Sequence, residues 1–120
     1  MAKILIVDDE HLTVEMLSTF LQLIGHQTIS ALSGRQTWDR LAYESPDLVL
    51  LDIMLPDDNG LEICRKLRAQ ESTRSLPIIM ISAYSPPMTR EAEEAGATGY
   101  LSKPIKLDTL KTAIAKTGVK

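Results

Sequence analysis

The sequence feature that most limits the fold is a run of four apolar residues, 48–51, that ends abruptly on the carboxylate of Asp52. A short apolar run without polar alternation indicates a strand buried on both faces, as in a parallel sheet covered by helices. Residues 53–60 are rich in turn formers, so we expect the strand to end near Asp52. Open parallel sheets bind ligands at the carboxyl ends of their strands. The pattern therefore predicts that Asp52 is the reactive group.

Two further apolar runs have the same form, and each also ends on polar side chains. Residues 4–7 lead directly into Asp8 and Asp9, and residues 78–81 lead into Ser82. Because none of these runs contains a polar residue, we expect all three to be interior strands. Residues 27–31 and 97–101 include polar residues or glycine, and this composition favours strands at the edges of the sheet.

Segments of helical period separate the five predicted strands, which gives five strand-then-helix units joined by short connections. Such an alternation predicts one parallel sheet with right-handed crossovers. With the mixed strands at the edges, the order is 2-1-3-4-5: an α/β, doubly wound, flavodoxin-like sheet whose topological switch lies between the first and third strands. The expected helices cover about residues 10–24, 33–44, a stretch opening at 59–60, 88–95 and 107–116.

Two of these helices carry detailed expectations. Ser33 and Gln36 form a capping-box pattern at the start of the second helix. In the last helix, the spacing of Leu107, Leu110 and Ile114 predicts that all three point inward.

Composition limits the class of protein. We expect residues 1–120 to be a single domain, since 44% hydrophobic and 24% charged residues are typical of a globular chain. The net charge of −3 and the lack of a basic run argue against direct nucleic-acid contact. No apolar stretch approaches the roughly 20 residues of a membrane span. A single cysteine, Cys64, excludes an internal disulfide and suits a reducing cytoplasm.

The carboxyl ends of parallel strands share one edge of the sheet, so Asp8, Asp9, Asp52, Ser82 and Lys103 are expected to meet. Carboxylates about 4 Å apart repel by roughly 4 kcal/mol per pair at an effective dielectric near 20. A cation or a proton must therefore share the site. Oxygen ligands of this kind suit Mg²⁺. A hard dication beside a carboxylate, an ammonium and a hydroxyl predicts phosphoryl transfer, with the carboxylate as nucleophile.

The motifs that contain these residues resemble those of the receiver domain of two-component response regulators, the family that includes CheY-like proteins. The match covers the whole chain in order and in spacing. The motifs are Val7-Asp8-Asp9, Leu51-Asp52-x-x-Leu55-Pro56-x-x-x-Gly60, Ile81-Ser82-Ala83 and Gly99-Tyr100-Leu101-Ser102-Lys103-Pro104.

This resemblance implies that Asp52 accepts a phosphoryl group from the phosphohistidine of a histidine kinase or phosphotransfer protein. It implies that Asp9, Asp52 and the backbone carbonyl of Met54 ligate Mg²⁺, with Asp8 acting through water, and that Lys103 holds a phosphoryl oxygen. The protein would catalyse its own phosphorylation and dephosphorylation in a phosphorelay, without being an enzyme on an external substrate.

The resemblance further implies a switch. The hydroxyl of Ser82 would move to the phosphate and the ring of Tyr100 would rotate inward behind it. An output domain or protein would then sense the state through the fourth helix, the fifth strand and the fifth helix. The Lys103-Pro104 peptide is usually cis in this family.

Three alternatives stay open at this point. An aspartate-nucleophile phosphatase of the haloacid dehalogenase kind needs Asp-x-Asp after the first strand, and Asp8-Asp9-Glu10 does not provide it. A flavin carrier of the flavodoxin kind needs a hydroxyl- and glycine-rich loop at the same place. A receiver-like interaction module that works without phosphorylation would not need the intact set of acids.

Overall fold

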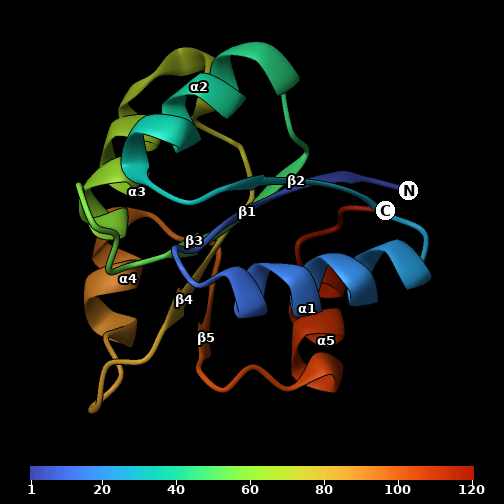
Figure 1. Ribbon diagram of the computed structural model, residues 1–120. Helices are drawn as coiled ribbons and strands as arrows, with labels where there is room; N and C mark the ends of the chain where they lie inside the picture. The colour runs from blue at the N-terminus through green and yellow to red at the C-terminus, as the bar shows by residue number, and fades with distance from the viewer.

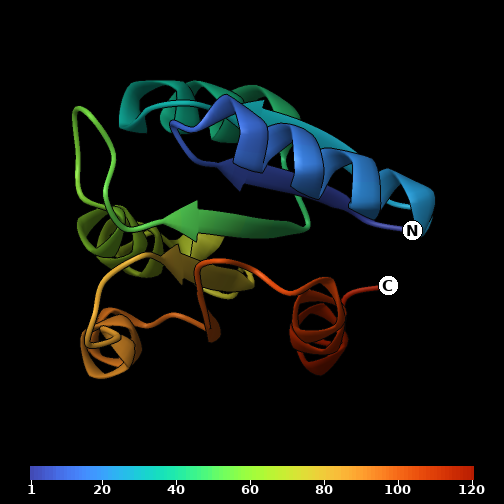
Figure 2. The same cartoon turned by 60° about the horizontal axis from the view of Figure 1, so that its bottom comes forward.

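The computed structural model describes residues 1–120 and contains one sheet of five parallel strands (Figures 1 and 2). The strand order is β2-β1-β3-β4-β5, so the chain reverses its direction of progress between β1 and β3. The predicted α/β class, strand order and switch point are confirmed. The strands are β1 (Lys3–Val7), β2 (Gln27–Ala31), β3 (Leu48–Asp52), β4 (Ile78–Ser82) and β5 (Gly99–Ser102).

Five α-helices cover the two faces of the sheet. Those on one face, α1 and α5, lie together on one side in Figure 1, and α2 and α3 lie on the other side. The core residues of α4 belong to the same cluster as those of α3. None of the helices has both the length and the apolar composition needed to cross a membrane. The helices are α1 (His11–Leu23), α2 (Gly34–Glu44), α3 (Gly60–Ala69), α4 (Thr89–Ala95) and α5 (Leu107–Lys116), with a short 3-10 helix, η1 (Glu71–Thr73).

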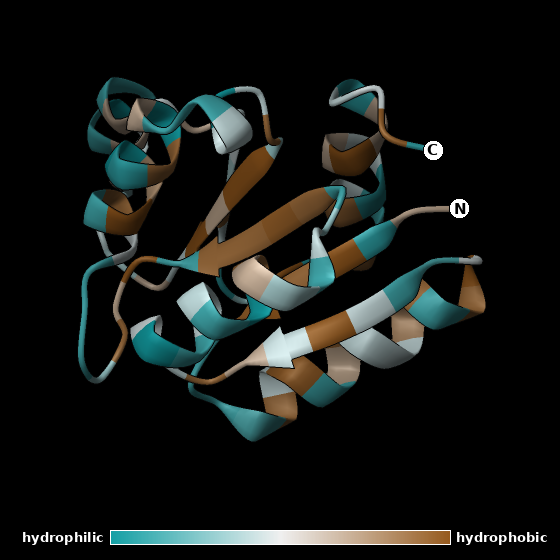
Figure 3. Cartoon of the chain, turned by 90° about the horizontal axis from the view of Figure 1, so that it is seen from above, coloured by the Kyte–Doolittle hydropathy of each residue, from teal (hydrophilic) through white to brown (hydrophobic).

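The interior strands are apolar except at a terminal residue (Lys3, Asp52 or Ser82), because both of their faces are covered. Successive side chains point to opposite faces of a strand. In β1, Leu5 and Val7 accordingly enter the core under α2, α3 and α4. Ile4 and Ile6 enter the core under α1 and α5. Figure 3 shows the result, with hydrophobic strands at the centre and hydrophilic helix surfaces outside.

The start of β5 differs from the prediction, which placed it at residue 97. The backbone N–H of Ala97 donates to the carbonyl of Ala92, and Gly96 has a φ of 95°. These are the features of a left-handed helix cap. Ala97 therefore completes the end of α4, and β5 begins at Gly99.

The capping prediction for α2 is confirmed with one change. The hydroxyl of Ser33 accepts a hydrogen bond from the N–H of Gln36, and the Gln36 side chain accepts from Leu32 N–H rather than from Ser33. In α5, Leu110 and Ile114 are buried as expected. The inward prediction for Leu107 is wrong, since this first residue of the helix is 36% exposed, beside the α1 surface at Leu12.

Candidate functional site

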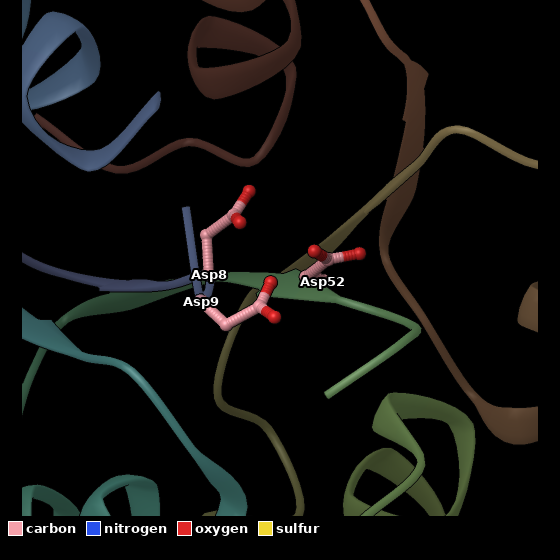
Figure 4. Close-up of side chains that lie close together, drawn as sticks. All are labelled: Asp8, Asp9 and Asp52. Atoms are coloured by element: carbon pink, nitrogen blue, oxygen red, sulfur yellow. The ribbon is translucent and has the colours of Figure 1, made fainter. Parts of the chain in front are cut away.

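Three carboxylates meet at the carboxyl edge of the sheet, on the two central strands. Val7 pairs with Leu51 in the parallel register, so the residues that follow β1 lie beside Asp52 at the end of β3. Oxygen atoms of Asp8, Asp9 and Asp52 lie within 4.8 Å of one another. Figure 4 shows the three side chains gathered around one space. The expectation that these acids converge is confirmed.

Burial differs sharply among the three. Asp8 is fully buried and Asp52 is 4% exposed, whereas Asp9 is exposed. Burial raises the pKa of Asp52 to about 6, and the like charge of Asp8 adds to this increase. Contacts with Lys103 and with the N–H of Met54 act in the opposite direction. Asp52 is therefore a carboxylate whose charge is costly to maintain in the metal-free site.

One ammonium group balances part of this charge. The Nζ atom of Lys103 lies 2.8 Å from Asp8 Oδ2, 3.1 Å from Asp52 Oδ2 and 3.1 Å from Glu10 Oε1. Burial by itself would lower the pKa of Lys103, but its contacts with these acids raise the pKa above its usual value. Lys103 follows β5 and precedes a cis peptide bond to Pro104, as the resemblance implied.

The acids still have unused capacity for a cation. Asp8 Oδ2 is buried and forms an ion pair with Lys103 at 2.8 Å, and Asp8 Oδ1 accepts from the N–H of Glu10 at 2.9 Å. The single ammonium of Lys103 faces the carboxylates of Asp8, Asp52 and Glu10 at once. Negative charge therefore remains that a further positive group would compensate. Oxygen donors alone are the ligands of hard cations, so this cluster could hold one divalent ion.

The acids open onto a cavity of about 540 Å³. Its lining combines charged side chains with apolar ones, and Met54 and Tyr84 are 60% and 39% exposed. A group the size of a phosphoryl donor can therefore reach Asp52 from solvent. The lining residues are Asp9, Glu10, Asp52, Met54, Leu55, Pro56, Ala83, Tyr84 and Lys103.

Ser82 and Tyr100 lie on the neighbouring strands β4 and β5. Ser82 is buried, and its hydroxyl oxygen accepts a hydrogen bond from the N–H of Tyr84 at 3.0 Å. That contact leaves the hydroxyl proton of Ser82 free to donate elsewhere. The hydroxyl oxygen of Tyr100 accepts from the N–H of Met88 at 2.9 Å, directly before α4. The two side chains are thus tied to the two ends of the β4–α4 connection.

Sequence reasoning missed Glu10 as part of the site. In the sequence it is only the first residue of a predicted helix, and its position there assigns it no role. In the structure its carboxylate shares Lys103 with Asp8 and Asp52, and the contact lowers the pKa of Glu10. The signal available in the sequence was a third acid directly after Asp8 and Asp9, but its role in the site is seen only from the position of Lys103 in the folded chain.

The role of Gly60 also becomes clear only in the structure. A Cβ atom at this position would lie 2.1 Å from the backbone oxygen of Asp52. Glycine is therefore required where the start of α3 crosses the end of β3.

Comparison with known proteins gives a consistent result. The family model described as the response regulator receiver domain matches residues 4–115. The chain is 35% identical to sporulation initiation phosphotransferase F of Bacillus subtilis, over 95% of this chain and 91% of that protein. It is similar in structure to the chemotaxis response regulator CheY4 of Vibrio cholerae, with a TM-score of 0.90, 30% identity and 98% of each chain covered.

Other relatives are much longer than this chain. It is 36% identical to the phosphate regulon transcriptional regulatory protein PhoB of Pseudomonas aeruginosa, over 96% of this chain but 52% of that protein. It is 35% identical to hybrid signal transduction histidine kinase L of Dictyostelium discoideum, over 98% of this chain and 7% of that protein. The same unit therefore occurs alone in some relatives and within longer chains in others.

Proposed function

This chain belongs to the response regulator receiver domain family of two-component signalling, and from that membership we propose that Asp52 is its phosphoacceptor. The proposal is supported by the position of Asp52 at the end of a central strand, below a solvent-accessible cavity. The single observation that carries it is the meeting of Asp52 with Lys103 at 3.1 Å and with two further acids within 4.8 Å. Asp8 shares these neighbours, but it is fully buried and does not line the cavity, whereas Asp52 does.

The chemistry follows from those neighbours. A carboxylate oxygen of Asp52 forms a bond to the phosphorus of a phosphohistidine, the phosphorus–nitrogen bond breaks, and the imidazole leaves with the electron pair. The product is an acyl phosphate. Lys103, already 3.1 Å from Asp52, is placed to neutralise charge on the phosphoryl oxygens. Electrostatic stabilisation and positioning supply most of what phosphoryl transfer requires.

We further propose Mg²⁺ as the cofactor, held by Asp9, Asp52 and the backbone carbonyl of Met54, with Asp8 acting through water. The negative charge that Lys103 alone does not balance and the all-oxygen donor set support this choice. When bound, the ion neutralises charge on the phosphoryl group and on the acids. Without it, the raised pKa of Asp52 leaves part of the nucleophile protonated near pH 6.

The switch is proposed to run from Ser82 to Tyr100. The free proton of the Ser82 hydroxyl donates to the new phosphate, and the Tyr100 ring rotates inward, which ends its hydrogen bond with Met88 N–H. The surface of α4, β5 and α5 then presents the altered state to an output domain or protein. On the input side, the partner is a histidine kinase or a phosphotransfer protein.

This chain is a signalling domain, and we propose that the domain extends over residues 1–120. We also propose that it acts only on its own Asp52, in phosphorylation and in hydrolysis of the product. Direct contact with nucleic acid or membrane is not part of the proposal. The cytoplasmic location expected from the sequence stays a prediction.

The test is incubation with Mg²⁺ and acetyl phosphate, followed by separation on a phosphate-affinity gel. We expect a shifted band for the parent chain and none for Asp52→Asn. Asp39→Asn is the matched control, because Asp39 is an exposed acid of α2 outside the cavity, and it should shift like the parent. A shifted Asp52→Asn protein, or an unshifted parent, would refute the assignment.

A further inference from the structure

The loop between β3 and α3, residues 53–59, forms one wall of the cavity and carries Met54. The backbone N–H groups of this loop donate to carbonyls of the loop itself and of the sheet. Leu55 N–H donates to the carbonyl of Asp58 at 3.2 Å, and Ile53 N–H donates to Ile81 of β4 at 3.1 Å. The carboxylate of Asp57 is different, because it reaches a helix elsewhere in the sequence.

Asp57 binds the start of α2 with both of its carboxylate oxygens. Oδ1 accepts from the N–H of Gly34 at 2.7 Å, and Oδ2 accepts from the N–H of Arg35 at 3.1 Å. The first N–H groups of a helix have no partner within the helix, and a negative charge there is favourable. The hydrogen bond from Gly34, followed by that from Arg35, lowers the pKa of Asp57. We call this pair of contacts the α2 clamp.

A second observation shows that the loop and the helix are fitted to each other. Gly34 is buried, and a Cβ atom there would lie 2.6 Å from Cβ of Asp58 and 3.3 Å from Oδ1 of Asp57. A side chain at position 34 would therefore press against the loop. Residue 34 must be a glycine for the α2 clamp to close, although alanine is the better residue for a helix.

The loop also touches the reactive carboxylate. The N–H of Met54 donates to Oδ1 of Asp52 at 3.3 Å. Because the α2 clamp lies three residues further along the same short loop, it restricts where the Met54 peptide can lie. The start of α2 and the site at Asp52 are thus connected through residues 54–57.

From these contacts we infer that Asp57 is a positioning residue: the α2 clamp holds the Met54 peptide in place and so sets the affinity of the site for Mg²⁺. The inference rests on the proposed function, in which Met54 and Asp52 hold the ion. Coupling between two sites is reciprocal in free energy. If the α2 clamp strengthens Mg²⁺ binding by a given factor, Mg²⁺ must stabilise the α2 clamp by the same factor.

The experiment compares Asp57→Ala with Asp58→Ala in the full chain, by calorimetric titration with MgCl₂. Both variants lose one negative charge on the same loop, but the side chain of Asp58 accepts a hydrogen bond only from the N–H of Asn59. We expect the dissociation constant for Mg²⁺ to rise about fivefold in Asp57→Ala, a typical coupling size, and less than about twofold in Asp58→Ala. Gly34→Ala, which opens the α2 clamp from the helix side, should also weaken Mg²⁺ binding.

A second measurement does not depend on activity or on loss of an acid. Amide hydrogen exchange at Gly34 and Arg35 of the parent chain should slow on saturation with Mg²⁺ by a similar factor, about fivefold. Exchange at the same amides should be fast in Asp57→Ala with or without Mg²⁺. If Asp57→Ala does not fold, Asp57→Asn, which keeps one acceptor oxygen, is measured instead and is expected to fall between the parent and a fully open α2 clamp.

The outcomes separate the two proposals. Tight Mg²⁺ binding by the parent with equal affinity for Asp57→Ala and Asp58→Ala overturns the positioning role alone. Exchange at Gly34 and Arg35 that ignores Mg²⁺ does the same. A parent chain that binds no Mg²⁺ overturns both the positioning role and the proposed function.

Discussion

Two neighbouring strand–helix units, β3–α3 and β4–α4, are built in opposite ways. The helix α3 has ten residues, of which five are buried, and the side chain of Asn59 accepts the N–H of Leu61 at its start. The helix α4 has seven residues, buries only Ala92 and Ala95, and has no side-chain cap from its own segment. The first helix is therefore specified locally, whereas the second depends on residues from elsewhere.

Those other residues lie at both ends of α4. At its start, the N–H of Met88 donates to the hydroxyl of Tyr100 in β5. At its end, Arg68 of α3 donates from Nε to the carbonyl of Gly96 at 2.7 Å. A helix with few buried apolar residues, whose ends are held partly by other elements, is expected to have low local stability. The locally specified helix α3 and the less stable helix α4 thus follow adjacent strands of one sheet.

The largest expected effect is the loss of stability when a buried side chain of α3 is shortened, compared with a substitution in α4. Leu67→Ala in α3 should lower the free energy of unfolding by about 3 kcal/mol, because Leu67 is fully buried and a cavity remains. Ala92→Gly in α4 should cost only about 1 kcal/mol, the usual loss of helix propensity. Urea denaturation followed by circular dichroism measures both. Equal losses in the two variants would contradict the comparison.

The second prediction compares the last residues of β3 and β4. Asp52 has a carboxyl group that gains and loses a proton in the accessible pH range, whereas the hydroxyl of Ser82 does not. Because the pKa of Asp52 is raised from 3.8 to about 6, the folded state binds more protons than the unfolded state between these values. The contribution of Asp52 to the stability of the metal-free parent should therefore fall as pH rises through this window. Above it, Asp52→Asn should be more stable than the parent by about 3 kcal/mol.

The measurement for this prediction is metal-free denaturation at pH 4.5 and pH 8. The advantage of Asp52→Asn should shrink at pH 4.5, where the carboxyl of the folded parent is protonated, and should disappear only below the unfolded-state pKa of 3.8. Ser82→Ala is the control and should keep the pH dependence of the parent. An Asp52→Asn protein with no advantage at pH 8 would show that Lys103 compensates the buried charge fully.

The smallest expected effect tests the hydrogen bond from Met88 N–H to the hydroxyl of Tyr100, which holds the start of α4. Tyr100→Phe removes the acceptor for Met88 N–H while it keeps the ring packed against the core, so local opening of α4 should become easier by about 1 kcal/mol. Amide exchange in residues 89–95 should accelerate roughly fivefold, and exchange in α3 should not change. Equal protection of α4 in both proteins would show that Tyr100 does not hold its start.

The sequence predicted the interior of the fold better than its margins. The uniform apolar runs at β1, β3 and β4 identified buried strands, because only a strand covered on both faces lacks polar alternation. The start of β5 was misplaced because Ala97 completes the cap of α4, a contact with Ala92 that composition does not reveal. The prediction for Leu107 was wrong because helical spacing shows only which residues share one face of a helix. It does not show that the first turn of α5 lies beside α1, where Leu107 stays partly exposed.

The sequence by itself determined which residues stand at the carboxyl ends of the strands, and thus that Asp8, Asp9, Asp52 and Lys103 meet, because parallel strands bring their ends to one edge. Only the tertiary structure decided how charge is shared there. The place of Glu10 beside Lys103, the ion pair of Asp8 with Lys103 and the hydrogen bonds of Asp57 to α2 depend on distances between elements remote in the chain. Local patterns carry backbone direction and burial, whereas electrostatic partners are fixed only when the packed helices set side chains within a few ångströms of each other.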